Sequence, residues 1–183
     1  GFDFSDEIQY TYKTPPVISA ISPRNAPVGE TVEITISGEY LSGDFRTEPA
    51  CRLEAFGNGT AEILDDKTMI CEIFCEEATR TVIEVGLNGQ DFIRNSSLSF
   101  GCSEAPEIAS INPQLGAIGG GTEVTITGSN FEPDSRIGCS FGSKTVPAEW
   151  VSSSSLTCVS PAAEQVGTVA VRVTNNGQHF AAT

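Results

Sequence analysis

An internal repeat constrains the fold of this chain more than any other feature. The motifs Gly1-Phe2-Asp3-Phe4, Gly89-Gln90-Asp91-Phe92 and Gly177-Gln178-His179-Phe180 begin at intervals of 88 residues. Between these anchors, residues 16–23 match residues 106–113, with isoleucine and proline at the same places. Self-similarity at a fixed period indicates repeated structural units. A chain of 183 residues therefore holds about two copies, each long enough to bury a hydrophobic core.

Within each copy, apolar and polar residues alternate over short runs, which is the period of a half-buried strand. The inward sets of the first copy are Val32, Ile34 and Ile36; Cys51 and Leu53; Met69, Cys71 and Ile73; and Ile83, Val85 and Leu87. Those of the second are Val124 and Ile126; Ile137, Cys139 and Phe141; Leu156 and Cys158; and Val169, Val171 and Val173. With 18 Gly and 10 Pro between the runs, the pattern predicts an all-β chain of sandwiches of antiparallel sheets.

Two Asn-Gly pairs set the frame of the domains. Asn88-Gly89 and Asn176-Gly177 each follow an apolar run, and this dipeptide predicts a two-residue hairpin turn because both positions need positive φ. A strand over residues 92–100 then completes the first copy. By analogy, residues 4–12, with Ile8, Tyr10 and Tyr12 facing inward, read as the last strand of a preceding domain.

The resulting division predicts three parts. We expect residues 1–14 to be the last strand of a preceding domain, residues 15–102 to be one domain, and residues 103–183 to be a second domain that lacks its final strand. The linker Ser103-Glu104-Ala105 is short, and Pro106 restricts the residue before it to extended conformations. We therefore expect adjacent domains to keep a limited range of angles.

The second copy contains two longer motifs. Residues 106–113 read Pro-x-Ile-x-x-Ile-x-Pro, and residues 120–131 read Gly-Gly-Thr-x-Val-Thr-Ile-x-Gly-x-Asn-Phe. With Cys139-Ser140-Phe141-Gly142 and Leu156-Thr157-Cys158-Val159-Ser160-Pro161, this copy resembles the IPT/TIG family. That resemblance implies immunoglobulin-like domains of the kind found in plexins, scatter-factor receptors, fibrocystin-like and protist surface proteins, and some transcription factors. The first copy departs from the pattern at Glu39-Tyr40-Leu41 and at Cys51-Arg52-Leu53-Glu54.

Six cysteines with regular spacing indicate disulfides rather than free thiols. Cys51 and Cys71 are 20 residues apart, Cys139 and Cys158 are 19 apart, and all four share the inward parity of their strands. Each pair is expected to bridge two strands through the core. Cys75 and Cys102 have no counterparts in the second copy, so by elimination they pair with each other.

Disulfides place the chain outside the cytosol, in the secreted pathway, as an extracellular or cell-surface segment. The sequons at Asn58 and Asn95 point the same way and predict N-linked glycans on the first copy only, which makes the second copy the expected contact surface. With 24 acidic and 10 basic residues the formal charge is −14. Such a field repels phosphate backbones and anionic lipids, so neither nucleic acid nor direct membrane insertion is expected.

Catalytic, cofactor and metal sites are not expected. His179, the only histidine, is interpreted as a solvated residue after the Asn176-Gly177 turn rather than a general base. Cys71-x-x-x-Cys75 lacks the partners of a zinc site. Asp65-Asp66 and Glu76-Glu77 are interpreted as solvated charge rather than as a calcium site. Gly119-Gly120-Gly121 is interpreted as a tight turn rather than as a phosphate loop. Trp150, which aligns with Ile63, is interpreted as core or partly buried packing.

Two functions fit a chain that is not an enzyme. In the first, these domains are a structural segment of an extracellular surface or filament protein, acting as stiff, disulfide-closed spacers and assembly modules. In the second, they belong to the ligand-binding ectodomain of a receptor or adhesin. The expected partners are neighbouring domains of the same array, other protein subunits or a surface ligand, and N-linked glycans.

Overall fold

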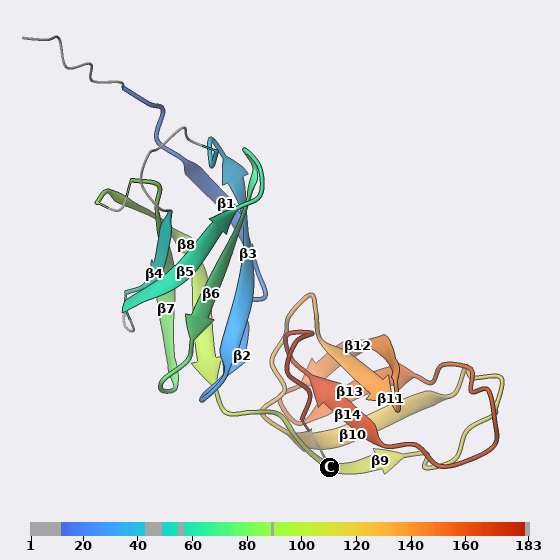
Figure 1. Ribbon diagram of the computed structural model, residues 1–183. Helices are drawn as coiled ribbons and strands as arrows, with labels where there is room; N and C mark the ends of the chain where they lie inside the picture. The colour runs from blue at the N-terminus through green and yellow to red at the C-terminus, as the bar shows by residue number, and fades with distance from the viewer. Residues whose placement is uncertain (1–11, 43–48, 55–56, 89, 182–183) are drawn as a thin grey trace, which may run out of the picture.

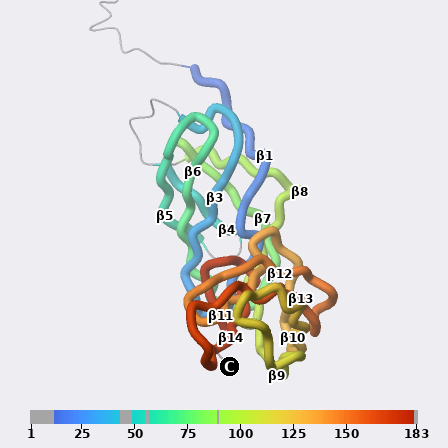
Figure 2. Tube along the Cα trace, turned by 90° about the vertical axis from the view of Figure 1, so that its right-hand side faces the viewer, coloured from blue at the N-terminus to red at the C-terminus, as the bar shows by residue number. Residues whose placement is uncertain are grey.

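The computed structural model describes residues 12–42, 49–54, 57–88 and 90–181. These residues form two all-β domains that follow one another along the chain, with the second set at an angle to the first (Figures 1 and 2). The strand expected over residues 4–12 lies outside the described residues except for Tyr12. Among the residues that the structure describes, no helix could cross a bilayer.

The first domain contains eight strands: β1 (Val17–Ser22), β2 (Asn25–Pro27), β3 (Thr31–Glu39), β4 (Ala50–Leu53), β5 (Gly57–Ile63), β6 (Thr68–Phe74), β7 (Thr79–Gly86) and β8 (Phe92–Ser103). Their order is β1-β3-β6-β5-β4-β7-β8-β2. β5 pairs with both β6 and β4, so it joins the two layers of an immunoglobulin-like sandwich. All neighbours are antiparallel except β2 and β8. The first strand is split, because its β1 half pairs with β3 and its β2 half pairs with β8.

The second domain repeats most of this topology. Its strands are β9 (Glu107–Asn112), β10 (Glu123–Ser129), β11 (Gly138–Phe141), β12 (Lys144–Ser152), β13 (Ser155–Val159) and β14 (Val171–Thr174). Their order, β14-β11-β12-β13-β10-β9, is that of β7-β4-β5-β6-β3-β1 in the first domain. Within residues 107–181, no strand corresponds to β8 or β2, and one bridge, from Val173 to Ala181, lies beyond β14.

The cores consist of the residues that the alternating pattern points inward. Every member of the first set is buried, including Val32, Ile34 and Met69 at 0% exposure. In the second set, Phe141 is only partly buried and Val169 is 54% exposed. The expectation for Val169 was wrong, because β11 ends at Phe141 opposite Val171 and leaves Val169 without a strand to pack against.

Neither Asn-Gly pair forms a two-residue hairpin, so that prediction was wrong. Gly86 pairs with Phe92, and Val173 pairs with Ala181, which leaves five and seven residues in the loops. Neither asparagine has positive φ. Instead, each asparagine side chain accepts hydrogen bonds from main-chain N–H groups two and three residues further on. Such side-chain turns compete with the backbone geometry of a tight hairpin.

Candidate functional site: the domain junction

Three disulfides connect the six cysteines, and all six are buried inside their domains. Cys51–Cys71 joins β4 to β6, and Cys139–Cys158 joins the equivalent β11 to β13. Cys75–Cys102 joins the segment after β6 to the end of β8, next to the linker. Cys51–Cys71 and Cys139–Cys158 are the pairs expected from the matched spacing, and Cys75–Cys102 is the pair expected by elimination. A chain whose cysteines are all oxidised belongs to an oxidising compartment.

The two sequons differ in how accessible their amides are. Asn58 is exposed on β5. Asn95, on β8, is partly buried, and its Nδ2 donates a 2.9 Å hydrogen bond to the carbonyl of Ile18 in β1. Its Oδ1 accepts from the N–H of Ser97 at 3.1 Å. Because a glycan attaches to the amide nitrogen, the surroundings of Asn58 are the more open of the two.

The acidic pairs lie in turns or on the surface. Asp65 accepts a hydrogen bond from the N–H of Lys67 at 2.7 Å, Asp66 accepts one from Ser42 Oγ at 2.8 Å, and Glu76-Glu77 is exposed. No group of three or more metal-binding side chains occurs in the described part of the chain. Gly120 and Gly121 have φ angles of 75° and 81° and turn the chain into β10.

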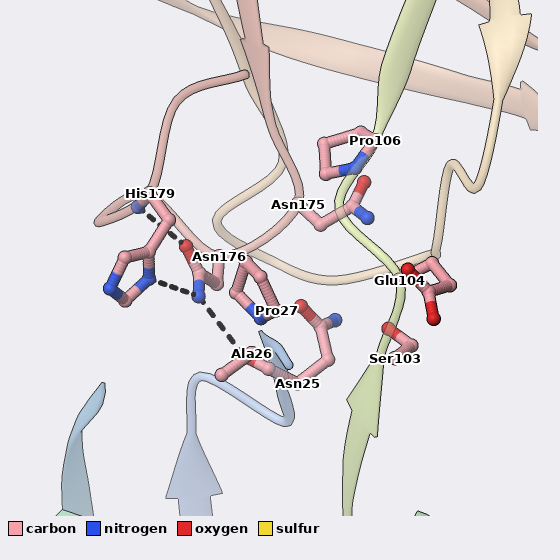
Figure 3. A pocket seen from close by; sticks show the side chains of 9 residues that line it. All are labelled: Asn25, Ala26, Pro27, Ser103, Glu104, Pro106, Asn175, Asn176 and His179. Carbon is pink, nitrogen blue, oxygen red and sulfur yellow. Dashed lines mark hydrogen bonds between the residues drawn. The ribbon is translucent and has the colours of Figure 1, made fainter. Parts of the chain in front are cut away.

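A cluster of polar residues lies where the second domain meets the first (Figure 3). Asn176, after β14, is 1% exposed. Its Oδ1 accepts from the N–H groups of Gln178 and His179, each at 3.0 Å, which sets the orientation of the amide. Its Nδ2 then donates to the carbonyl of Asn25 in β2 at 3.2 Å. The buried side-chain amide of Asn176 therefore stabilises its own turn and also binds the first domain. Asn176, Gln178 and His179 are called the docking turn below.

Gln178 binds an open strand edge of the first domain. The pairing of β1 with β3 ends at Ser22 and Thr35, so the main chain of Glu33 has no β1 residue beside it. Gln178 Nε2 donates to the carbonyl of Glu33 at 2.6 Å, and Gln178 Oε1 accepts from the N–H of Glu33 at 3.0 Å. The side-chain amide therefore satisfies both main-chain groups, as a neighbouring strand would.

His179 does not lie in open solvent, so its interpretation as a solvated hairpin residue was wrong. Its side chain is 21% exposed and lines the cleft between the domains (Figure 3). Its Nδ1 lies 3.1 Å from Asn176 Nδ2 and accepts, because that nitrogen is a donor. The ring proton is then on Nε2, which lies 3.9 Å from Glu30 Oε2 of the first domain.

Further contacts join the linker and both domains. Asp134 Oδ2 accepts from the N–H of Arg24 at 2.9 Å, and Arg80 lies 3.6 Å from Glu132. Asn130 Nδ2 donates to the carbonyl of Ala105 in the linker at 3.0 Å. These interdomain contacts are polar, while Ala26, Pro27 and Pro106 also line the junction. Polar contacts of this kind set an orientation more strongly than they drive association.

A groove of about 630 Å³ opens beside these contacts. Ile21 and Arg24 line it from the first domain, and Asp134 and Trp150 line it from the second. Trp150 is 39% exposed, and its Nε1 donates to the carbonyl of Phe131 at 3.0 Å. The sequence alignment of Trp150 with Ile63 agrees with the strand registers, since each lies opposite a core residue six positions on. Its indole nonetheless borders the groove and is only partly packed.

Sequence reasoning missed the docking turn. Its signal was the recurrence of Asn-Gly-Gln at residues 88–90 and 176–178, which was interpreted as a hairpin. The contacts to Asn25 and Glu33 span 151 and 145 residues, so no local pattern could indicate them.

Comparison with known proteins agrees with this architecture. The family model of the IPT/TIG domain matches residues 16–101 and again residues 106–183. Mouse plexin-A4 is 29% identical over 161 residues, which is 84% of this chain, and human plexin-A4 is 27% identical over the same length. The chain spans only 8% of the length of these curated relatives.

A solved structure of the plexin A4 extracellular region, domains 1 to 10, covers 99% of this chain with a TM-score of 0.66 and 22% identity, and the match spans 16% of that structure. This likeness concerns the fold. The oxidised cysteines and the similarity to plexin-A4 make this chain an extracellular or cell-surface segment. Two matches to one family model cover most of the residues, and the chain therefore belongs to the IPT/TIG domain family.

Proposed function

We propose that this chain is a non-catalytic segment of a plexin-like receptor ectodomain, in which it holds successive domains at a set angle and presents them to a protein ligand. The similarity to plexin-A4 supports the receptor hypothesis over the filament hypothesis. The stiff, disulfide-closed spacer foreseen from the sequence is retained in this proposal as the mechanical role of the segment. Its partners are the adjoining domains, other protein subunits or a surface ligand, and N-linked glycans.

The observation that carries the proposal is the double attachment of the docking turn. Asn176 binds the carbonyl of Asn25, and Gln178 binds both main-chain groups of Glu33, so the second domain is held at two places on the first. Each hydrogen bond contributes about 0.5–1.5 kcal/mol net, and leaving a buried partner unsatisfied costs about 1–3 kcal/mol. Two separated attachments restrict rotation about the linker, which one attachment would allow.

The groove beside the junction is the proposed contact surface for a partner. Trp150 offers an aromatic face, and Arg24 and Asp134 offer charge at its sides. Exposed tryptophan and arginine are the residues most often found at the energetic centre of protein interfaces. Because residues of both domains form the groove, its shape depends on the angle that the docking turn maintains.

The test is the interdomain angle of the Gln178→Ala variant, measured by residual dipolar couplings and small-angle X-ray scattering in dilute solution. We expect a wider range of angles with unchanged folding of each domain. Gln90→Ala is the matched control, because Gln90 occupies the same place in an exposed turn of the first domain. It should leave the angle unchanged. An unaltered angle in Gln178→Ala would contradict the spacer role.

A further inference from the structure

The docking turn contains an Asn-Gly pair, Asn176-Gly177, which can react with itself. The main-chain nitrogen of the glycine attacks Cγ of the asparagine, because glycine has no Cβ to block the approach. The nitrogen loses its proton and bonds to Cγ, and Nδ2 leaves as ammonia. Water then opens the cyclic imide to give aspartate or isoaspartate. The rate therefore depends on whether the two reacting groups are free to meet.

Gly177, which supplies the attacking nitrogen, is held by a buried threonine. Its N–H donates to Oγ1 of Thr174, the last residue of β14, at 2.8 Å. The same hydroxyl accepts from the N–H of Asn176 at 3.2 Å and donates to Asn176 Oδ1 at 3.3 Å. Thr174 is 0% exposed. Loss of the Gly177 proton would break a hydrogen bond to this buried hydroxyl, which slows the first step of the reaction.

The amide of Asn176, which supplies the attacked carbon, is restrained at both of its polar atoms. Oδ1 accepts from the N–H groups of Gln178 and His179, each at 3.0 Å. Nδ2 donates to the carbonyl of Asn25 in the first domain at 3.2 Å and to His179 Nδ1 at 3.1 Å. Turning Cγ toward the nitrogen of Gly177 would break these bonds, and one of them joins the two domains. The closed junction therefore protects Asn176.

The first domain contains the same reactive sequence with fewer restraints. Residues 88–90 repeat the Asn-Gly-Gln sequence of the docking turn. Gly86 stands at the place of Thr174 and has no hydroxyl that could accept a hydrogen bond. Asn88 is partly exposed, and its Nδ2 donates to Asp91 in the same turn. Asn88 is therefore an internal reference for the reaction without docking in this chain.

A carboxylate at position 176 would not restore the junction. An oxygen in the place of Nδ2 would face the carbonyl of Asn25, and two acceptors leave each other unsatisfied. Glu30, which lies 3.9 Å from His179, and Glu104, which lines the same cleft, add like charge. His179 would offset the new charge only by taking a proton on Nδ1, the atom that now accepts from the amide.

Isoaspartate would change the main chain as well. The chain would then run through the side-chain carbon and be one carbon longer just before Gly177. Gln178 binds both main-chain groups of Glu33, at 2.6 and 3.0 Å, and this pair of bonds needs the side-chain amide in register with the strand edge. An extra carbon two residues earlier moves Gln178 out of that register.

We infer that Asn176-Gly177 is a deamidation site controlled by domain docking. The reaction is suppressed while the junction is closed and proceeds when the junction opens, and its products keep the junction open. Water is the co-reactant, and ammonia is the leaving group. This inference rests on the proposed function, since it requires that the docking turn holds the second domain on the first. It adds a one-way chemical release of that attachment.

The test follows deamidation of the full 183-residue chain in mildly alkaline buffer, by peptide mapping that separates asparagine, aspartate and isoaspartate. Rates in guanidinium chloride, where the turns are lost, give the intrinsic reactivity of each site. Relative to these, we expect Asn176 in the folded chain to react roughly tenfold or more slowly than Asn88, because the reaction follows the population of the open state.

Gln178→Ala should accelerate the reaction at Asn176 severalfold. Gln90→Ala is the matched control, because it makes the same change beside Asn88 and should leave the rate at Asn176 unaltered. Thr174→Val removes the hydroxyl at nearly constant shape and should also accelerate Asn176, whereas Thr174→Ser, which keeps the hydroxyl, should not.

Asn176→Asp stands for the product, and the N–H of Glu33 should exchange severalfold faster in it than in the wild type. Equal relative rates at Asn88 and Asn176 in the folded wild type, or an unchanged Glu33 in Asn176→Asp, would overturn the inference. If Gln178→Ala widens the interdomain angle without accelerating Asn176, the inference fails and the proposed function stands. An unchanged angle would contradict the proposed function, and the wild-type rates and Asn176→Asp would still decide the inference.

Discussion

Tyr40 and Asn130 occupy the same left-handed backbone position in the two domains, with φ angles of 60° and 61°. Each directly follows the last residue of a strand, Glu39 of β3 or Ser129 of β10. These two strands occupy equivalent places in their domains. Asparagine tolerates this region, whereas other side chains with a Cβ pay about 1–2 kcal/mol there. Asn130 also binds the carbonyl of Ala105. The departure of the first copy from the family motif at Glu39-Tyr40-Leu41 therefore leaves a strained residue in the first domain.

Replacing Tyr40 with Asn should stabilise the first domain by about 0.5–1 kcal/mol, because it relieves the strain at an exposed side chain. Tyr40 is 48% exposed, so little packing is lost. Urea unfolding followed by signals of the first domain measures the change. Tyr40→Phe keeps the strain and should show no gain. A destabilised Tyr40→Asn would mean that the tyrosine ring contributes more than its backbone costs.

Asp in place of His179 should weaken the junction through repulsion from Glu30, which lies 3.9 Å from the ring nitrogen. The turn itself should persist, since Asp91 accepts the equivalent hydrogen bond from Asn88. Because the side chain at position 179 is only partly exposed and Glu30 is exposed, we expect an effect of about 0.5–1 kcal/mol that decreases with salt. The readout is hydrogen exchange at the N–H of Glu33, which binds Gln178.

Exchange at Glu33 should accelerate severalfold in His179→Asp and return toward wild type when Glu30→Gln is added. His179→Asn, which carries no charge, is the control and should have a smaller effect. Faster exchange that Glu30→Gln fails to reverse would show that the introduced aspartate disturbs the packing of the junction and does not act through repulsion from Glu30.

Non-reducing peptide mapping should recover Cys51–Cys71, Cys75–Cys102 and Cys139–Cys158. The Cys75–Cys102 bridge closes a loop of 27 residues beside the linker. On the chain-entropy model, replacing both cysteines with Ser should lower the free energy of unfolding of the first domain by about 3.5 kcal/mol. The other two bridges should survive. Any bridge between the domains would contradict the assignment.

N-linked glycans are expected at Asn58 and Asn95, with higher occupancy at Asn58. Asn58 is exposed, while the amide nitrogen of Asn95 is bound to Ile18. Glycopeptide mass spectrometry of protein from a secreting eukaryotic host gives both occupancies. Asn58→Gln should leave folding unchanged, whereas Asn95→Gln should loosen the contact between β8 and β1. A bare Asn58 alongside an occupied Asn95 would contradict the structural reasoning.

The assignment of domains beyond the described residues stays a prediction. We expect residues 1–14 to complete a preceding domain and a further strand to complete the second domain beyond β14. A structure of a longer chain would test both expectations. Pairing of residues 4–12 inside the first domain would exclude the first of them.

The sequence by itself determined the repeat, the β class and the core, because strand alternation is a local pattern that directly reports which side chains are buried. Val32, Ile34 and Met69 were placed in this way, and so were the pairs Cys51–Cys71 and Cys139–Cys158, whereas Cys75–Cys102 followed by elimination. Where the pattern ran past the end of a partner strand, as at Val169, it failed.

Only the tertiary structure decided what the polar residues do. From the sequence, Asn176-Gly177 was interpreted as a hairpin turn and His179 as a solvated residue after it. The partners of Asn176, Gln178 and His179 are Asn25, Glu33 and Glu30, which belong to the other domain. Trp150 likewise became part of a groove only when the two domains met. Hydrogen bonds between residues about 150 positions apart depend on how two folded surfaces come together, and no local periodicity encodes that arrangement.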